Sequence, residues 1–170
     1  LDVVVIAMLF VLRALGGAAA IQVEASPWLL ICTFMLCLFL GFGKRRCEIA
    51  AIGDVEAIRE HRPTLVRYTP HLLTHLLSSS GGMAIITFLL YTLDTRPTPF
   101  EAQKQQLIYT LPLVVYGIFR YAMLIELGKA TGPTDLIIKD PPFLVALFLW
   151  LILAGLILYG PLGLWGTVAG

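Results

Sequence analysis

The stretch PFLVALFLWLILAGLILYG, residues 142–160, carries no charged side chain. The hydrocarbon core of a bilayer, about 30 Å thick, is crossed by roughly 20 helical residues at about 1.5 Å each, so this run has the length of one transmembrane helix. Asp140-Pro141-Pro142 opens the run and Gly160-Pro161 closes it. Because backbone in lipid must satisfy its own hydrogen bonds, and no period-2 alternation marks a barrel strand, we predict a helix.

Four more runs of this kind precede it in the chain, so the predicted spans are residues 3–23, 27–43, 71–93, 107–125 and 142–160. The second run is the shortest, and we expect its helix to continue past Gly43. The 170 residues are 58% hydrophobic and 14% charged, whereas a soluble domain has about 45–50% apolar and about 25% charged residues. We therefore predict an all-α integral membrane protein in which residues 1–170 form a single transmembrane helical domain of five helices.

The cations are unevenly distributed between the two faces of this predicted bundle. Twelve Lys and Arg balance eleven Asp and Glu, so a global basic field for nucleic acid is excluded. One face has two loop cations, Arg96 and Lys104. The face that follows the second and fourth spans has eight: Lys44, Arg45, Arg46, Arg59, Arg62, Arg67, Lys129 and Lys139. By the positive-inside rule, the face with eight cations is cytoplasmic, and we expect a multi-pass protein of the plasma (inner) membrane.

The segment Gly41-Phe-Gly-Lys-Arg-Arg-Cys-Glu48 is the strongest candidate for a functional site. In a continued helix Lys44 and Glu48 share one face, which makes them candidate catalytic residues. Arg45 and Arg46 offer bidentate donors to phosphate, and Glu48 is a candidate ligand of a Mg²⁺ ion that bridges a pyrophosphate. The alternative is a set of cations that anchors the helix next to lipid headgroups.

Three further residues are candidate phosphate ligands. Arg13 lies deep in the first span, where a charge costs at least roughly 2.5–3.5 kcal/mol, so we expect it to face the bundle interior. Arg120 lies near the predicted cytoplasmic end of the fourth span, and Tyr68 precedes the third span. Snorkelling of Arg120 to the headgroups is the alternative.

The histidines and cysteines give weaker signals. His71 and His75 are four residues apart, but a zinc site needs a third ligand that the pattern does not supply. Cys32, Cys37 and Cys47 fit no zinc or redox template, so we expect buried free thiols that pack as small apolar groups.

Several of these motifs resemble the UbiA-type polyprenyltransferase superfamily, and the Gly-Lys-Arg-Arg-x-Glu form resembles its decaprenyl-phosphate phosphoribosyltransferase branch. The matching stretches are Val11–Ile21, Ser26-Pro-Trp, Leu40–Ile49, Arg62-Pro, Arg67-Tyr-Thr, Phe119-Arg-Tyr and Pro133–Pro142. The resemblance extends to about Tyr159. Most of the superfamily carries a second aspartate-rich motif where this chain has Lys44–Glu48, which favours the phosphoribosyl branch.

The resemblance implies a nine-helix bundle around a cavity open to the cytoplasm, of which this chain would be the C-terminal half. The missing N-terminal half would then carry the aspartate-rich motif that binds Mg²⁺ and pyrophosphate, so this chain alone is expected to be inactive. The implied reaction transfers phosphoribose from phosphoribosyl pyrophosphate to decaprenyl phosphate, in cell wall biosynthesis. The implied partners are membrane lipid, the polyprenyl phosphate, the pyrophosphate substrate and possible further copies in an oligomer.

Two other functions stay open at this point. A related transferase would move the prenyl group itself to an aromatic or glycerol-type acceptor. A transporter or a structural membrane subunit belongs to a different class, which more ionisable residues within the spans would favour.

Overall fold

The computed structural model describes residues 2–52, 69–95, 101–127 and 140–159, and none of these lies in a strand. The elements are α1 (Asp2–Ala20), α2 (Pro27–Ile52), α4 (Pro70–Leu93), α5 (Glu101–Gln106), the 3₁₀ helix η2 (Leu107–Thr110), α6 (Leu111–Glu126) and α8 (Pro141–Tyr159). Five helical segments among them are long and apolar enough to cross a membrane: Asp2–Ala20, Pro27–Ala50, Pro70–Leu93, Gln103–Glu126 and Pro141–Tyr159. The predicted all-α fold with five spans is confirmed.

The first span ends three residues earlier than its apolar run predicts. Gln22 adopts a left-handed φ of 55°. The amide of Gln22 donates to the carbonyl of Ala19, and that of Val23 donates to the carbonyl of Ala18. These two bonds form a Schellman motif, which closes α1 at Ala20. The sequence did not signal this end because glutamine stands where glycine is usual.

The fourth span is entered through α5 and η2 rather than through one continuous α-helix. Pro112, the second residue of α6, has no amide hydrogen, and its ring excludes a normal α-helical turn before it. The chain passes that point as η2, where the Thr110 hydroxyl donates to the carbonyl of Leu107 at 2.7 Å. The second span, in contrast, continues as helix past Gly43 to Ile52, as predicted.

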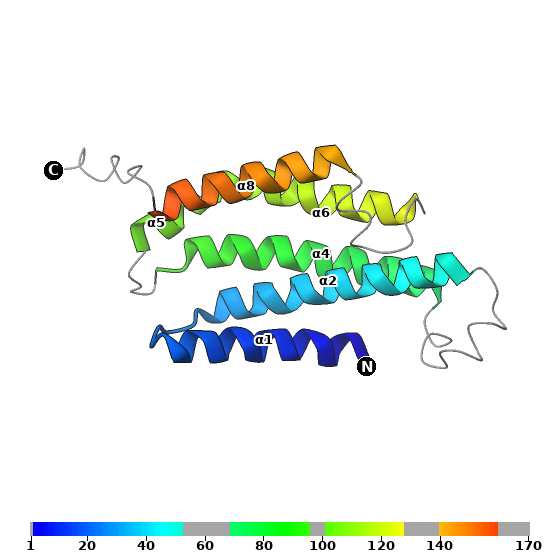
Figure 1. Cartoon of the computed structure of the whole chain (residues 1–170), viewed down its shortest axis with the longest axis horizontal. Helices are drawn as coiled ribbons and strands as arrows, with labels where there is room; N and C mark the ends of the chain where they lie inside the picture. The colour runs from blue at the N-terminus through cyan, green and yellow to red at the C-terminus, as the bar shows by residue number, and fades with distance from the viewer. Residues whose placement is uncertain (1, 53–68, 96–100, 128–139, 160–170) are drawn as a thin grey trace.

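Successive spanning helices run in opposite directions, with α2 and α4 between α1 on one side and α6 and α8 on the other (Figure 1). This topology brings the start of α1, the end of α2, the start of α4, the end of α6 and the start of α8 to one end of the bundle. We call this end of the bundle the basic end. It holds Thr74 and the charged residues Asp2, Lys44, Arg45, Arg46, Glu48, Arg120, Glu126 and Asp140.

The main core lies where α2, α4 and α6 meet. Tyr121 on α6 is only 1% exposed, and its ring centroid lies 5.2 Å from that of Phe39 on α2. Leu73 and Leu77 of α4 belong to the same cluster. A smaller cluster nearer the opposite end joins α4, η2 and α8. The three central helices therefore share one packed interior, which fixes the ends of α2 and α6 relative to each other.

At the opposite end, Lys104 of α5 is buried rather than exposed to solvent in a loop. Its Nζ lies 3.7 Å from the Asp94 carboxylate and 5.4 Å from the centroid of the Tyr91 ring. The Ser26 hydroxyl donates to the same carboxylate at 3.2 Å. These contacts join α5 to the start of α2 and the end of α4.

Two glycines let α2 approach helices on opposite sides. A Cβ at Gly41 would lie 2.5 Å from Cγ1 of Val3 on α1. A Cβ at Gly43 would lie 2.6 Å from Cδ1 of Ile125 and 2.9 Å from the hydroxyl of Tyr121, both on α6. Since residues two apart on a helix point about 200° apart, α2 is held closely on both sides at the basic end.

We expect Gly43→Leu to destabilise the protein, because its side chain would overlap the buried ring of Tyr121. Overpacking of this kind costs about 1–3 kcal/mol. Gly16→Leu is the matched control, since a Cβ at Gly16 meets nothing within 4 Å. The midpoint of thermal unfolding of the purified protein in detergent measures both, and equal midpoints for the two variants would contradict close packing at Gly43.

Candidate functional site

Arg45 of α2 is held by two carboxylates. Its Nη2 lies 2.7 Å from the Asp2 carboxylate on α1, and its Nη1 donates to Glu48 one turn further along α2. The Arg45 side chain is 13% exposed. Arg45 therefore joins α1 to α2, and its two ion pairs are mostly shielded from solvent.

Lys44 differs from its two neighbours, because its side chain is exposed at the basic end. Within the described residues no ion pair or hydrogen bond of its ammonium group is found. Glu48, which we expected to share a ligand with Lys44, is instead paired with Arg45. Lys44 is thus the cation of this run that is most accessible to an anion.

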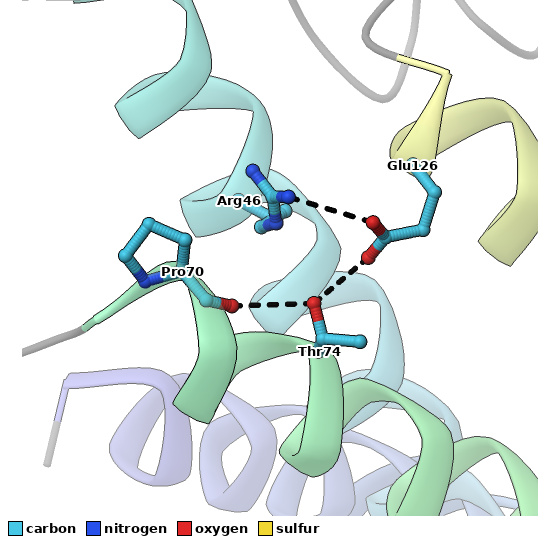
Figure 2. Close-up of polar contacts among 4 residues, drawn as sticks. All are labelled: Arg46, Pro70, Thr74 and Glu126. Carbon is cyan, nitrogen blue, oxygen red and sulfur yellow. Dashed lines mark hydrogen bonds and ion pairs between the residues drawn. The ribbon is translucent and has the colours of Figure 1, made fainter.

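Arg46 takes part in a contact that spans three helices (Figure 2). Its Nη2 lies 3.4 Å from Oε2 of Glu126, the last residue of α6. The other carboxylate oxygen of Glu126 accepts a hydrogen bond of 2.8 Å from the Thr74 hydroxyl on α4. That hydroxyl also lies 3.2 Å from the carbonyl oxygen of Pro70. We call Arg46, Glu126 and Thr74 the Arg46 clasp.

The sequence prediction missed Glu126 and Thr74, although Glu126 carries a usable signal. A carboxylate in the last turn of a helix is disfavoured by the helix dipole, so it needs a cationic or hydrogen-bonding partner. Thr74 gives no such signal, because threonine hydroxyls commonly bond to their own helix.

Arg120 of α6 binds Asp140, the residue that precedes α8. Its Nε and Nη2 donate to the two oxygens of Asp140 at 2.9 and 2.7 Å. Asp140 also caps α8, since its carboxylate accepts the Phe143 amide at 3.0 Å. The hydrogen bonds from Arg120, more than the cap itself, hold the pKa of Asp140 below its ordinary value. This bidentate pair fixes the start of α8 against α6.

We expect the stability that Asp140 contributes to depend on pH. Its pKa is lowered by folding, so the contribution is complete above the ordinary pKa of about 3.9 and is lost as pH falls through the lowered value. Unfolding midpoints of the wild-type protein and of Asp140→Asn should therefore differ at pH 7 and converge at strongly acidic pH. A constant difference across this range would show that the carboxylate charge does not hold α8.

Of the two other predicted phosphate ligands, only Arg13 lies within the described residues. Arg13 is exposed on α1, with its guanidinium 5.6 Å from the centroid of Phe10, so the described helices do not enclose it and its expected interior position stays a prediction. It lies eleven residues from Asp2, which is about 16 Å along the helix. Tyr68 lies outside the described residues, as do Arg59, Arg62, Arg67, Lys129 and Lys139.

The described residues do not fit a Mg²⁺ site. No group of three His, Cys, Asp or Glu side chains is placed to hold a metal ion within the described ranges. Glu48, the predicted ligand, directs a carboxylate oxygen to Arg45 instead. We therefore derive no metal-dependent step from this part of the chain.

The histidines and thiols also lack a metal-site arrangement. The rings of His71 and His75 meet edge to face with centroids 4.5 Å apart, and both side chains are exposed. All three cysteines are free; Cys47 is buried, as predicted, while Cys32 and Cys37 are only partly buried.

An apolar groove with a cavity volume of about 310 Å³ lies between α2, α4, α6 and α8. Trp150 of α8 and Leu29 of α2 line it toward the opposite end, and Tyr121 and Phe143 line it toward the basic end. Phe143 is also the residue whose amide binds Asp140. The groove therefore ends beside the Arg120–Asp140 pair.

No family model matches the chain, but individual relatives do. The decaprenyl-phosphate phosphoribosyltransferase of Corynebacterium glutamicum is 26% identical over 88% of this chain and 44% of its own length. The enzyme of that name from Mycolicibacterium smegmatis is 25% identical over 94% of this chain and 51% of its own length. The resemblance to decaprenyl-phosphate phosphoribosyltransferases is confirmed.

The chain spans about half the length of these curated relatives. An uncharacterised protein of Sinorhizobium fredii is 33% identical over 68% of this chain and 22% of its own length. Together with the five apolar helices, the names of the first two relatives indicate a multi-pass membrane protein of the transferase class.

Proposed function

We propose that this chain forms part of an integral-membrane transferase that moves phosphoribose from phosphoribosyl pyrophosphate to decaprenyl phosphate. The observation that carries the proposal is an apolar groove that ends beside the Arg120–Asp140 pair, at the same end of the bundle as Arg45, Arg46 and the exposed Lys44. A polyprenyl phosphate has the matching form, with a long apolar tail and an anionic head. The names of the relatives supply the acceptor and the transferred group, and the resemblance to the superfamily implies phosphoribosyl pyrophosphate as the donor.

The groove is assigned to the polyprenyl tail, and its contribution is one of shape. Lipid tails are as apolar as the groove, so entry of the tail from the bilayer gains little hydrophobic free energy. The groove instead orients the tail so that its phosphate lies at the basic end. Most of the binding free energy must then come from contacts to the phosphate.

Lys44 and Arg120 are assigned to the phosphates of the substrates. Lys44 is exposed and has no carboxylate partner within the described ranges. Arg120 gives Nε and Nη2 to Asp140, which leaves Nη1 for a further acceptor, and its side chain is 26% exposed. An oxygen of the lipid phosphate would attack the anomeric carbon as pyrophosphate leaves, and these cations would stabilise the negative charge and position both groups.

We also propose that the basic end faces the cytoplasm, where the water-soluble donor is present. The support is the excess of loop cations on this side of the predicted spans. Any Mg²⁺ that accompanies the pyrophosphate would need ligands other than the described residues, as the resemblance to the superfamily implies.

Lys44→Ala should lower transfer by about 10²–10³-fold if Lys44 contacts charge that develops in the transition state. Its unfolding midpoint should stay near the wild-type value, because Lys44 holds no described partner. The assay follows labelled phosphoribosyl pyrophosphate into decaprenyl phosphate, in membranes that contain the chain together with the part of the Corynebacterium glutamicum relative that it does not span. The chain alone is tested in parallel and is expected to be inactive.

The matched control is Gln105→Ala, an exposed polar residue of α5 at the opposite end. Near-equal rates for both variants at equal amounts of folded protein would make Lys44 a headgroup anchor. A prenylated aromatic or glycerol-type product, in place of a phosphoribosyl lipid, would favour the related prenyl-transfer reaction.

Gly117→Leu should weaken binding of decaprenyl phosphate at least about five-fold, because the new side chain enters the groove. Gly117 lines the groove, and a Cβ there meets nothing within 4 Å, so the fold should tolerate the change. Gly155→Leu on α8 is the control, since Gly155 is equally open but does not line the groove. Binding is measured in nanodiscs with labelled lipid, and equal losses for the two variants would exclude the groove as the tail site.

A further inference from the structure

The charges of the basic end cancel within the described residues. The four cations are Lys44, Arg45, Arg46 and Arg120, and the four carboxylates are Asp2, Glu48, Glu126 and Asp140. A phosphorylated ligand that approaches an arginine here therefore meets a guanidinium that already contacts a carboxylate. The three arginines differ in how firmly they are held.

Arg46 is the most weakly held of the three arginines. Its contact with Glu126 is 3.4 Å long, whereas Arg120 and Arg45 each reach a carboxylate at 2.7 Å. The Nε of Arg46 is buried and has no hydrogen-bond acceptor among the described residues. Glu126 is 43% exposed, so its carboxylate can be hydrated if it leaves Arg46.

The hydrogen bonds of Thr74 also permit the Glu126 carboxylate to leave Arg46. A hydroxyl has one proton, which bonds to the Glu126 carboxylate at 2.8 Å in preference to the neutral Pro70 carbonyl at 3.2 Å. Both acceptors are within reach of the same hydroxyl, as Figure 2 shows. If Glu126 moves away, Thr74 can donate to Pro70 and remains satisfied.

We propose that Glu126 is a positioning residue that occupies Arg46 and lowers its affinity for phosphate until a phosphorylated ligand displaces the carboxylate. The inference deepens the proposed function, because it rests on the basic end as the phosphate site. The ligand chemistry is a phosphate dianion or pyrophosphate, whose oxygens satisfy the guanidinium better than one long carboxylate contact does. The same phosphate chemistry is present in anionic lipid headgroups.

The test is the dissociation constant of inorganic pyrophosphate for the chain in phosphatidylcholine nanodiscs. Glu126→Gln keeps the size of the side chain and removes its charge, so we expect binding about two- to five-fold tighter, the range typical of an exposed ion pair. In an Arg46→Gln background the same change should have no effect, because Glu126 acts through Arg46. A purely structural role would not produce this dependence on Arg46.

Glu24→Gln is the matched control, since it removes one exposed carboxylate between α1 and α2, at the opposite end. If Glu24→Gln also binds pyrophosphate more tightly, the effect of Glu126→Gln is explained by net charge alone, and the proposal is overturned. Glu126→Asp tests the contact separately, because it keeps the charge but shortens the reach to Arg46, and it should also tighten binding. Unchanged or weaker binding by both Glu126 variants would overturn the inference.

The outcomes separate this inference from the proposed function. Pyrophosphate binding by the wild-type chain without a Glu126 effect would overturn the clasp alone. Absence of binding would overturn the inference as well, while the transfer assay on Lys44→Ala tests the proposed function. Discs that contain phosphatidylglycerol distinguish the two sources of phosphate. A Glu126 effect that persists there assigns Arg46 to the free ligand, and an effect that disappears assigns it to headgroups; either result supports displacement of Glu126.

Discussion

The approach of α1 and α6 to α2 at Gly41 and Gly43 determines the arrangement of the basic end. Apolar surface gives little net gain when helices associate in lipid, so close backbone packing of this kind has to supply much of the association. Arg45 follows Gly41 by four residues and Arg46 follows Gly43 by three, so each arginine lies near the face of its glycine. The glycines thereby bring Asp2 and Glu126 within reach of the two arginines.

This packing explains why a run of three cations does not produce a uniformly basic surface. A partly buried arginine loses hydration, and a carboxylate on the neighbouring helix offsets that loss. Arg45 and Arg46 have such partners, and Lys44, which points between the two contact faces, has none within the described residues. Neighbouring residues of one helix turn therefore differ in environment, with two arginines paired across helices and one lysine exposed.

Hydropathy and helix-end signals were sufficient to predict the five spans, because lipid allows few alternatives to a helix for runs of this length. The end of α1 at Ala20, closed by the left-handed Gln22, and the 3₁₀ turn before Pro112 were not predicted, since they depend on local backbone geometry. The Lys44–Glu48 segment was predicted as a candidate site from its charges, its place at a helix end and the family resemblance. Its partners Asp2 and Glu126 were not, because they approach only after the helices pack.

The groove and the charge-compensated basic end would affect the binding of different parts of the proposed polyprenyl phosphate substrate. The tail gains little free energy on leaving the bilayer, so the head must supply most of the selectivity. At the head, however, each arginine already has a carboxylate, so a phosphate that displaces the carboxylate gains only the difference between two similar contacts. A site of this design favours ligands with several phosphate oxygens over a single carboxylate or a monoanionic headgroup, because only they return more hydrogen bonds than the displaced partner provided.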